Sequence, residues 1–115
     1  MLEYTGVLTQ EEKEMLYKLS MDINRITDNK LDKVMLVDYE SDNADYGILL
    51  IFKATDEELQ SFESKVEEVV YDYDLDHDIV ILAFSYTEGK YTEDKPTHLF
   101  RLPEDKVEVL YGENE

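Results

Sequence analysis

The sequence predicts an α/β fold of the α+β kind, in which two main helices pack on a small mixed sheet of three to five strands. Three short apolar runs, at residues 34–37, 48–52 and 79–85, are rich in Val, Ile and Leu, as β-strands are. Two longer segments, after Thr9 and Thr55, instead repeat their apolar residues at the 3.6-residue period of a helix. We therefore expect one sheet covered by both helices.

A single domain is expected over residues 1–115, since a hydrophobic content of 43% in a chain of this length supports one core. Residues 1–8 should form an N-terminal arm, and residues 112–115 a frayed tail. The sequence has no cysteine, which excludes disulfides, thiolate zinc sites and thiol nucleophiles. Neither a basic flank nor a long apolar run follows Met1, so we expect no signal peptide, no membrane span and a cytoplasmic location.

Both helices begin with a capping box, in which a threonine hydroxyl and a glutamate side chain each bond to a free backbone amide. Residues 9–12 form the first box and residues 55–58 the second. The first helix should end near residues 27–29. The apolar stripes that should face the core are Met15, Leu16, Leu19, Ile23 and Ile26 in the first helix, and Leu59, Phe62, Val66, Val69, Val70 and Tyr73 in the second.

The sequence predicts some of the strands more clearly than others. The runs 34–37 and 48–52 are continuously apolar, which is typical of strands covered on both faces, and the polar loop between them is short enough for an antiparallel hairpin. The run 79–85 is the most strand-like of all. Residues 86–97 should form a loop, with or without a helical turn, and the alternating residues 107–111 an edge strand or a final extended segment.

Charge is the strongest compositional signal, because 29 acidic residues against 11 basic ones give a formal net charge of −18. Such a charge repels phosphate backbones and anionic membranes, so we expect neither direct nucleic-acid binding nor membrane binding. Attractive partners would be basic surfaces, including proteins that themselves hold nucleic acid. A charge that serves only solubility remains the alternative.

Half of this net charge falls on the second predicted helix and the residues that follow it. Residues 56–78 contain ten acidic residues and only Lys65 as a base, a net charge of −9. We expect this acidic surface to be an interface that attracts its partner electrostatically. Its candidate residues are Asp56, Glu63, Glu67, Asp72, Asp74 and Asp76.

Four segments, together with the order of the helices and strands, carry a family resemblance over about residues 9–111. The segments are Val34-Met35-Leu36-Val37, Asp45-Tyr46-Gly47-Ile48-Leu49-Leu50, Asp78-Ile79-Val80-Ile81 and Val107-Glu108-Val109-Leu110-Tyr111. In this order the chain resembles a minimal nucleotidyltransferase domain of the DNA polymerase beta type. The four segments would be the first strand, the carboxylate strand, the third-aspartate strand and the final strand of that family.

The resemblance implies a degenerate active site. In active members a Gly-Ser turn holds the triphosphate, and two aspartates on one strand plus a third hold two magnesium ions. This chain has Asp38-Tyr39 at the turn, and the partner position of Asp45 is Gly47, which has no side-chain oxygen. Only Asp78 or Asp76 could supply the third carboxylate. Asp45, Asp76 and Asp78 are thus candidates for a remnant metal site, or simply solvated ends of strands and helices.

Three functional hypotheses follow. The first is a pseudoenzyme without a cofactor: an acidic protein that binds a basic nuclease or toxin, as an antitoxin or a phage-type inhibitor that mimics DNA charge would. The second is a divergent nucleotidyltransferase that uses magnesium, Asp45 and Asp78. The third is an orphan soluble domain. We expect His77 and His98 to be surface residues, because they lack ligand spacing, and most of the nine tyrosines to lie half-buried at element edges. The sequence does not specify an oligomeric state.

Overall fold

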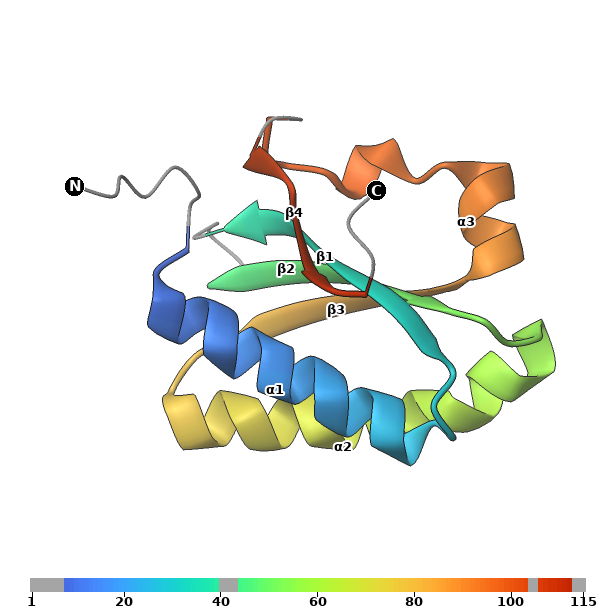
Figure 1. Ribbon diagram of the computed structural model, residues 1–115, viewed down its shortest axis with the longest axis horizontal. Helices are drawn as coiled ribbons and strands as arrows, with labels where there is room; N and C mark the ends of the chain where they lie inside the picture. Colours follow the sequence, from blue (N-terminus) through green and yellow to red (C-terminus); the bar gives the residue numbers. More distant parts are fainter. Residues whose placement is uncertain (1–7, 40–43, 104–105, 113–115) are drawn as a thin grey trace.

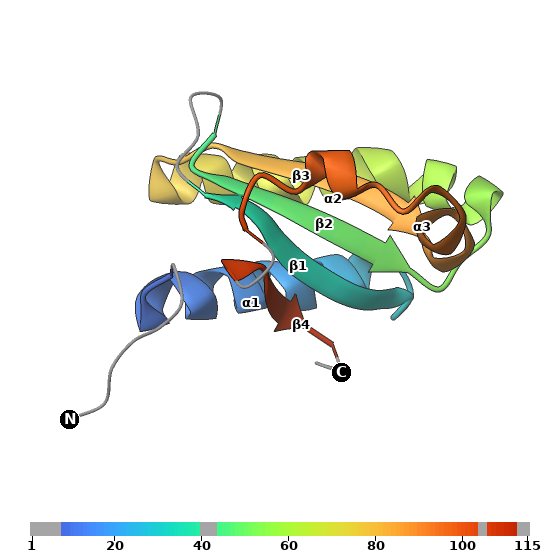
Figure 2. The same cartoon turned by 90° about the horizontal axis from the view of Figure 1, so that it is seen from above.

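The computed structural model describes residues 8–39, 44–103 and 106–112. Its elements are α1 (Gln10–Ile26), β1 (Leu31–Tyr39), β2 (Tyr46–Phe52), α2 (Asp56–His77), β3 (Ile81–Thr87), α3 (Glu88–Asp94), the 3₁₀ turn η1 (Thr97–Leu99) and β4 (Glu108–Tyr111). The strands form one mixed sheet in the order β3-β2-β1-β4 (Figures 1 and 2). β1 is antiparallel to β2 and β4, whereas β2 and β3 are parallel. The predicted fold class and hairpin are confirmed.

Helices α1 and α2 lie side by side on one face of the sheet (Figure 1). Both predicted capping boxes are present, at Thr9 with Glu12 and at Thr55 with Glu58. The apolar stripes of both helices pack on the inward-facing residues of the sheet, as predicted. Among the most buried side chains of this layer are Leu8, Leu16, Leu19, Ile23, Val34, Leu36, Ile48, Leu50 and Phe52.

The opposite face of the sheet is covered by α3, η1 and the segment that leads to β4 (Figure 1). A second apolar cluster there joins Met35 and Val37 of β1 and Leu49 and Ile51 of β2 to partly buried side chains of the covering segments. All seven residues of β2 are buried. The prediction that the first two strands are covered on both faces is therefore correct.

The third strand begins two residues later than its apolar run suggests. Asp78 adopts a left-handed conformation with φ of 55°, and the backbone N–H of Ile79 still donates to the carbonyl of Asp74, at 3.0 Å. These contacts continue the end of α2 as far as Ile79, and β3 starts at Ile81. The apolar side chains of Val80, just before β3, and Leu82, within it, are 47% and 37% exposed.

Residues 88–94 lie in the stretch predicted as a loop with or without a helical turn, and they form the seven-residue helix α3. The hydroxyl of Thr87 caps this helix by accepting a hydrogen bond from the N–H of Lys90. β4 is an edge strand, as one of the two alternatives proposed. Leu8, the one described residue of the expected arm, is fully buried, and most of the expected tail lies outside the described residues. No described helix is long and apolar enough to cross a membrane.

Candidate functional site

The glycine at the expected second-aspartate position is required by packing. Gly47 of β2 lies opposite Asp38 of β1, next to an irregularity in the register of the hairpin. A Cβ atom on Gly47 would lie 2.7 Å from the Cβ of Asp38, far inside van der Waals contact. An aspartate at position 47 would therefore displace β1.

Asp45, the matched carboxylate, connects β2 to the start of β3. Its side-chain Oδ2 accepts a hydrogen bond from the backbone N–H of Val80, at 2.9 Å, and its own N–H donates to the carbonyl of Val80, at 2.8 Å. The residue is exposed, but its carboxylate is engaged with the backbone. In this arrangement Asp45 fixes where the chain enters β3.

Asp74 is the carboxylate that the fold brings near Asp45. Its Oδ1 accepts a hydrogen bond from the N–H of Ile81, at 3.1 Å. Burial, and to a smaller extent the negative charge of Asp45, raise the pKa of Asp74 above its ordinary value, against the effect of that hydrogen bond. Two carboxylates thus lie close together where β2 and β3 begin, and the second is not one of the residues predicted for a metal site.

The other two candidates for a remnant metal site lie elsewhere. Asp78 is the exposed left-handed residue that ends α2, and Asp76 lines a groove between α1 and α2. Within residues 8–39, 44–103 and 106–112, no three Asp, Glu or His side chains form a group that could hold a metal ion.

The six residues predicted as one acidic interface are distributed over three places. Glu63, Glu67 and Asp74 line a groove between α2 and β3. Asp72 and Asp76 lie on the other side of α2, toward α1. Asp56 is at the start of α2, where its Oδ1 accepts a hydrogen bond from the hydroxyl of Thr87, at 3.4 Å.

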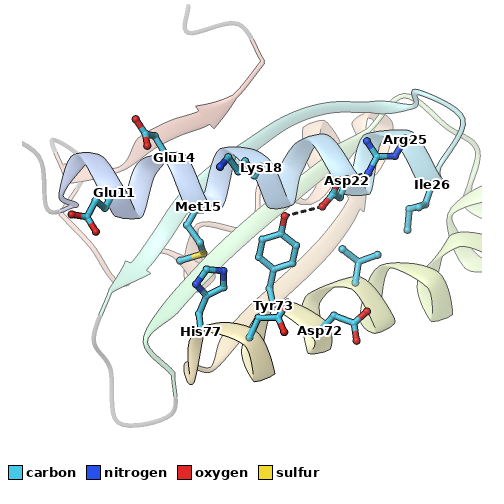
Figure 3. Close-up of a pocket in the computed structure, with 12 residues that line it drawn as sticks. Glu11, Glu14, Met15, Lys18, Asp22, Arg25, Ile26, Asp72, Tyr73 and His77 are labelled. Atoms are coloured by element: carbon cyan, nitrogen blue, oxygen red, sulfur yellow. Dashed lines mark hydrogen bonds and ion pairs between the residues drawn. The ribbon is translucent and has the colours of Figure 1, made fainter.

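The groove between α1 and α2 is large but of mixed charge (Figure 3). Its volume is about 700 Å³, and Lys18 and Arg25 line it together with several carboxylates. The hydroxyl of Tyr73 donates across the groove to Asp22, at 2.7 Å. Burial and this hydrogen bond raise the pKa of Tyr73 to about 12. The groove therefore contains an internal contact that joins the two helices.

The groove between α2 and β3 has a volume of about 320 Å³ and a different character. Apolar side chains form its floor and glutamates lie along its helical side. Among the residues that the structure describes, no lysine or arginine lines this groove. Its lining residues are Glu63, Val66, Glu67, Val70, Tyr71, Asp74, Ile81, Leu82, Ala83 and Ser85. This is the site where the acidic surface meets exposed apolar side chains.

Glu12 has a wider role than the capping box predicted for it. Its Oε1 accepts from the N–H of Thr9, and its Oε2 accepts from the hydroxyls of Tyr46, at 2.5 Å, and Tyr39, at 3.3 Å. Burial alone would raise the pKa of Glu12, but the hydrogen bonds from Thr9 and the tyrosines hold it below its ordinary value. Burial and Glu12 also raise the pKa of Tyr46. The capping pattern reveals Glu12 itself, but no local signal reveals the two tyrosine contacts.

Comparison of the chain with protein-family models, with curated proteins and with solved structures finds no match to any of them. The resemblance to nucleotidyltransferase domains therefore depends on the sequence segments and on the order of the elements.

Proposed function

We propose that this chain is a non-catalytic acidic binding protein that docks a basic, nucleic-acid-handling protein, such as a ribonuclease toxin or a nuclease complex. One observation carries the proposal: a net charge of −18, half of it in residues 56–78, with most of those carboxylates exposed along α2. Like charges so closely spaced repel one another and reduce stability, and a basic partner would remove that cost. A cytoplasmic location, expected from the sequence, belongs to the same proposal.

A charge-reversal experiment tests this function. The binding variant carries Glu63→Lys, Glu67→Lys and Glu68→Lys, all at exposed positions of α2. The control carries Glu88→Lys, Glu93→Lys and Asp94→Lys, which make the same change of net charge on α3, across the sheet. Asp74 is left unchanged, because its carboxylate bonds to the start of β3.

The partner is first captured from the cells that naturally contain the protein, and its association rate is then measured at several ionic strengths. We expect the α2 variant to associate about ten times more slowly or worse and to lose its salt dependence, while the control changes little. Equal slowing of both variants would assign the effect to net charge alone. Unchanged rates in both would mean that the acidic surface serves only solubility.

The absence of catalysis is the second part of the proposal. It is supported by Asp38 in place of the phosphate-binding turn and by the space that Asp38 denies to any side chain at position 47. Incubation with labelled nucleoside triphosphates, magnesium and candidate acceptors should yield no labelled product. Transfer that Asp45→Ala abolishes would instead favour the divergent magnesium-dependent nucleotidyltransferase.

A further inference from the structure

We propose that the groove between α2 and β3 binds an extended, positively charged segment of the partner protein, which adds to the sheet as a fifth strand beside β3. This inference rests on the proposed function, since it names the chemistry of the segment that the acidic protein would take. Such binding requires three features at one place: an open strand edge, an apolar floor, and carboxylates whose spacing matches that of alternate side chains on a strand.

The first feature is the open edge of the sheet. β3 is the last strand in the order β3-β2-β1-β4, and Figure 2 shows it at the margin of the sheet, with α2 behind it. Within the described part of the chain no strand pairs with its outer side. β3 contains no proline, lysine or bulge, the devices that usually protect an edge strand.

The hydrogen bonds at Val80 establish which backbone groups face outward. The N–H and C=O of Val80 both engage Asp45, on the β2 side. Backbone groups of successive strand residues point to alternate sides, so those of Ile81, Ala83 and Ser85 point away from β2. Asp74 already accepts the N–H of Ile81, which confirms this direction. Ala83 and Ser85 therefore present their N–H and C=O groups to an added strand.

The second feature is apolar surface beside this edge. Val66 and Val70 form the floor of the groove on the helix side, and Tyr71 and Leu82 are 61% and 37% exposed. Lysine or arginine side chains of an added strand that point toward α2 would lay their apolar stems over this floor and keep their charged ends beside the glutamates. The alternate side chains, which point to the opposite face, would lie next to Leu82. An amphipathic strand thus gains apolar contact as well as backbone hydrogen bonds.

The third feature is the spacing of the two glutamates on the helical side. Glu63 and Glu67 are four residues apart, so they are separated by about 6 Å along the helix axis. Alternate side chains on one face of a strand are about 6.6 Å apart. Lysine or arginine at every second position of the added strand therefore matches both carboxylates at once.

The negative charge of the groove favours one kind of occupant at the edge of β3 over the others. Pairing with a second copy of the chain through β3 would bring the glutamates of both grooves together, in molecules that each carry a net charge of −18. Nucleic acid would bring phosphates to the same carboxylates. A basic peptide segment is the occupant that the groove attracts.

The probe for the test is a capped peptide of about eight residues in which lysine and valine alternate. Two further peptides carry N-methyl groups, one on all its lysines and the other on all its valines. Each set of methyl groups blocks the backbone donors on one edge of the extended peptide, and only one edge can face β3. Binding is measured by titration calorimetry, and exchange of the amide hydrogens of Ala83 and Ser85 by NMR. The protein is unchanged in this comparison, so no folding defect can affect it.

We expect the parent peptide to bind and to slow exchange at both amides by about tenfold or more. One N-methylated peptide should lose binding while the other retains it. In the protein, Glu63→Gln with Glu67→Gln should weaken binding about three- to tenfold, from the loss of two exposed ion pairs. Glu57→Gln with Glu68→Gln, which removes the same charge from exposed positions outside the groove, should change binding far less.

Three results would overturn the added strand. One is that both N-methylated peptides bind as well as the parent peptide while the amides of Ala83 and Ser85 stay unprotected. This result would still be compatible with the proposed acidic binding function. Another is a complete failure of the parent peptide to bind while the captured partner still associates in a charge-dependent way. The last is a dimer of the protein alone in sedimentation equilibrium that Ala83→Pro dissociates, since a second copy would then occupy the edge.

Discussion

Replacing Gly47 by alanine tests whether packing excludes a side chain at the position where an active nucleotidyltransferase would carry its second aspartate. The new Cβ would lie 2.7 Å from the Cβ of Asp38, whereas carbon atoms in contact prefer about 3.5–4.0 Å. Relief requires a shift of β1 itself, because the contacted atom is fixed to the backbone. β2 is buried on both faces, so the shift would disturb both apolar layers.

The magnitude follows from two opposing effects. Overpacking of a well-packed site typically costs about 1–3 kcal/mol of unfolding free energy. Alanine also restricts the unfolded chain, which returns about 0.4–1 kcal/mol. We therefore expect Gly47→Ala to lower the free energy of unfolding by about 1–2 kcal/mol, measured by urea denaturation followed by circular dichroism.

A matched control and a double-mutant cycle make the test specific. Gly89 lies in α3, where a Cβ would meet nothing within 4 Å, so Gly89→Ala should be neutral or stabilising by up to about 1 kcal/mol. In an Asp38→Gly background the clash is absent, and Gly47→Ala should cost little. An alanine at position 47 that leaves stability unchanged, or costs the same in both backgrounds, would refute the packing argument.

Three further predictions concern titrating groups, each measured by urea unfolding across pH. Tyr73→Phe should lower the free energy of unfolding by about 1 kcal/mol near neutral pH. Because the pKa of Tyr73 is raised, the wild-type protein should lose this extra stability as the pH rises from about 10 to about 12. A stability difference that stays constant over this pH range would contradict the prediction. Asp74→Asn should stabilise the protein at neutral pH, since the raised pKa marks an unfavourable charge, and the gain should vanish as acid protonates the wild-type carboxyl. Glu12→Ala should lower the free energy of unfolding by about 1 kcal/mol or more at neutral pH. Because the pKa of Glu12 lies below its ordinary value of 4.5, this loss of stability should persist as the pH falls to about 4.5 and should disappear only in stronger acid.

The helices and the central hairpin could be predicted because their signals are local. Thr9 and Thr55 satisfy backbone amides three residues away, and the apolar stripes depend only on helical periodicity. The continuous apolar runs of β1 and β2 likewise indicate strands covered on both faces, whatever covers them. The sequence alone therefore determined the two main helices, the antiparallel hairpin and the acidic character of α2.

The tertiary structure decided how the candidate residues are grouped. Asp74 was assigned to an outer acidic surface, yet it bonds to Ile81, because the start of β3 returns past the last turns of α2. Asp45 was matched to a metal ligand, yet it bonds to Val80, 35 residues later in the chain. The contact that requires glycine at position 47 likewise exists only across the paired strands. These contacts depend on strand order and register, which join residues far apart in the sequence and leave no pattern within either segment.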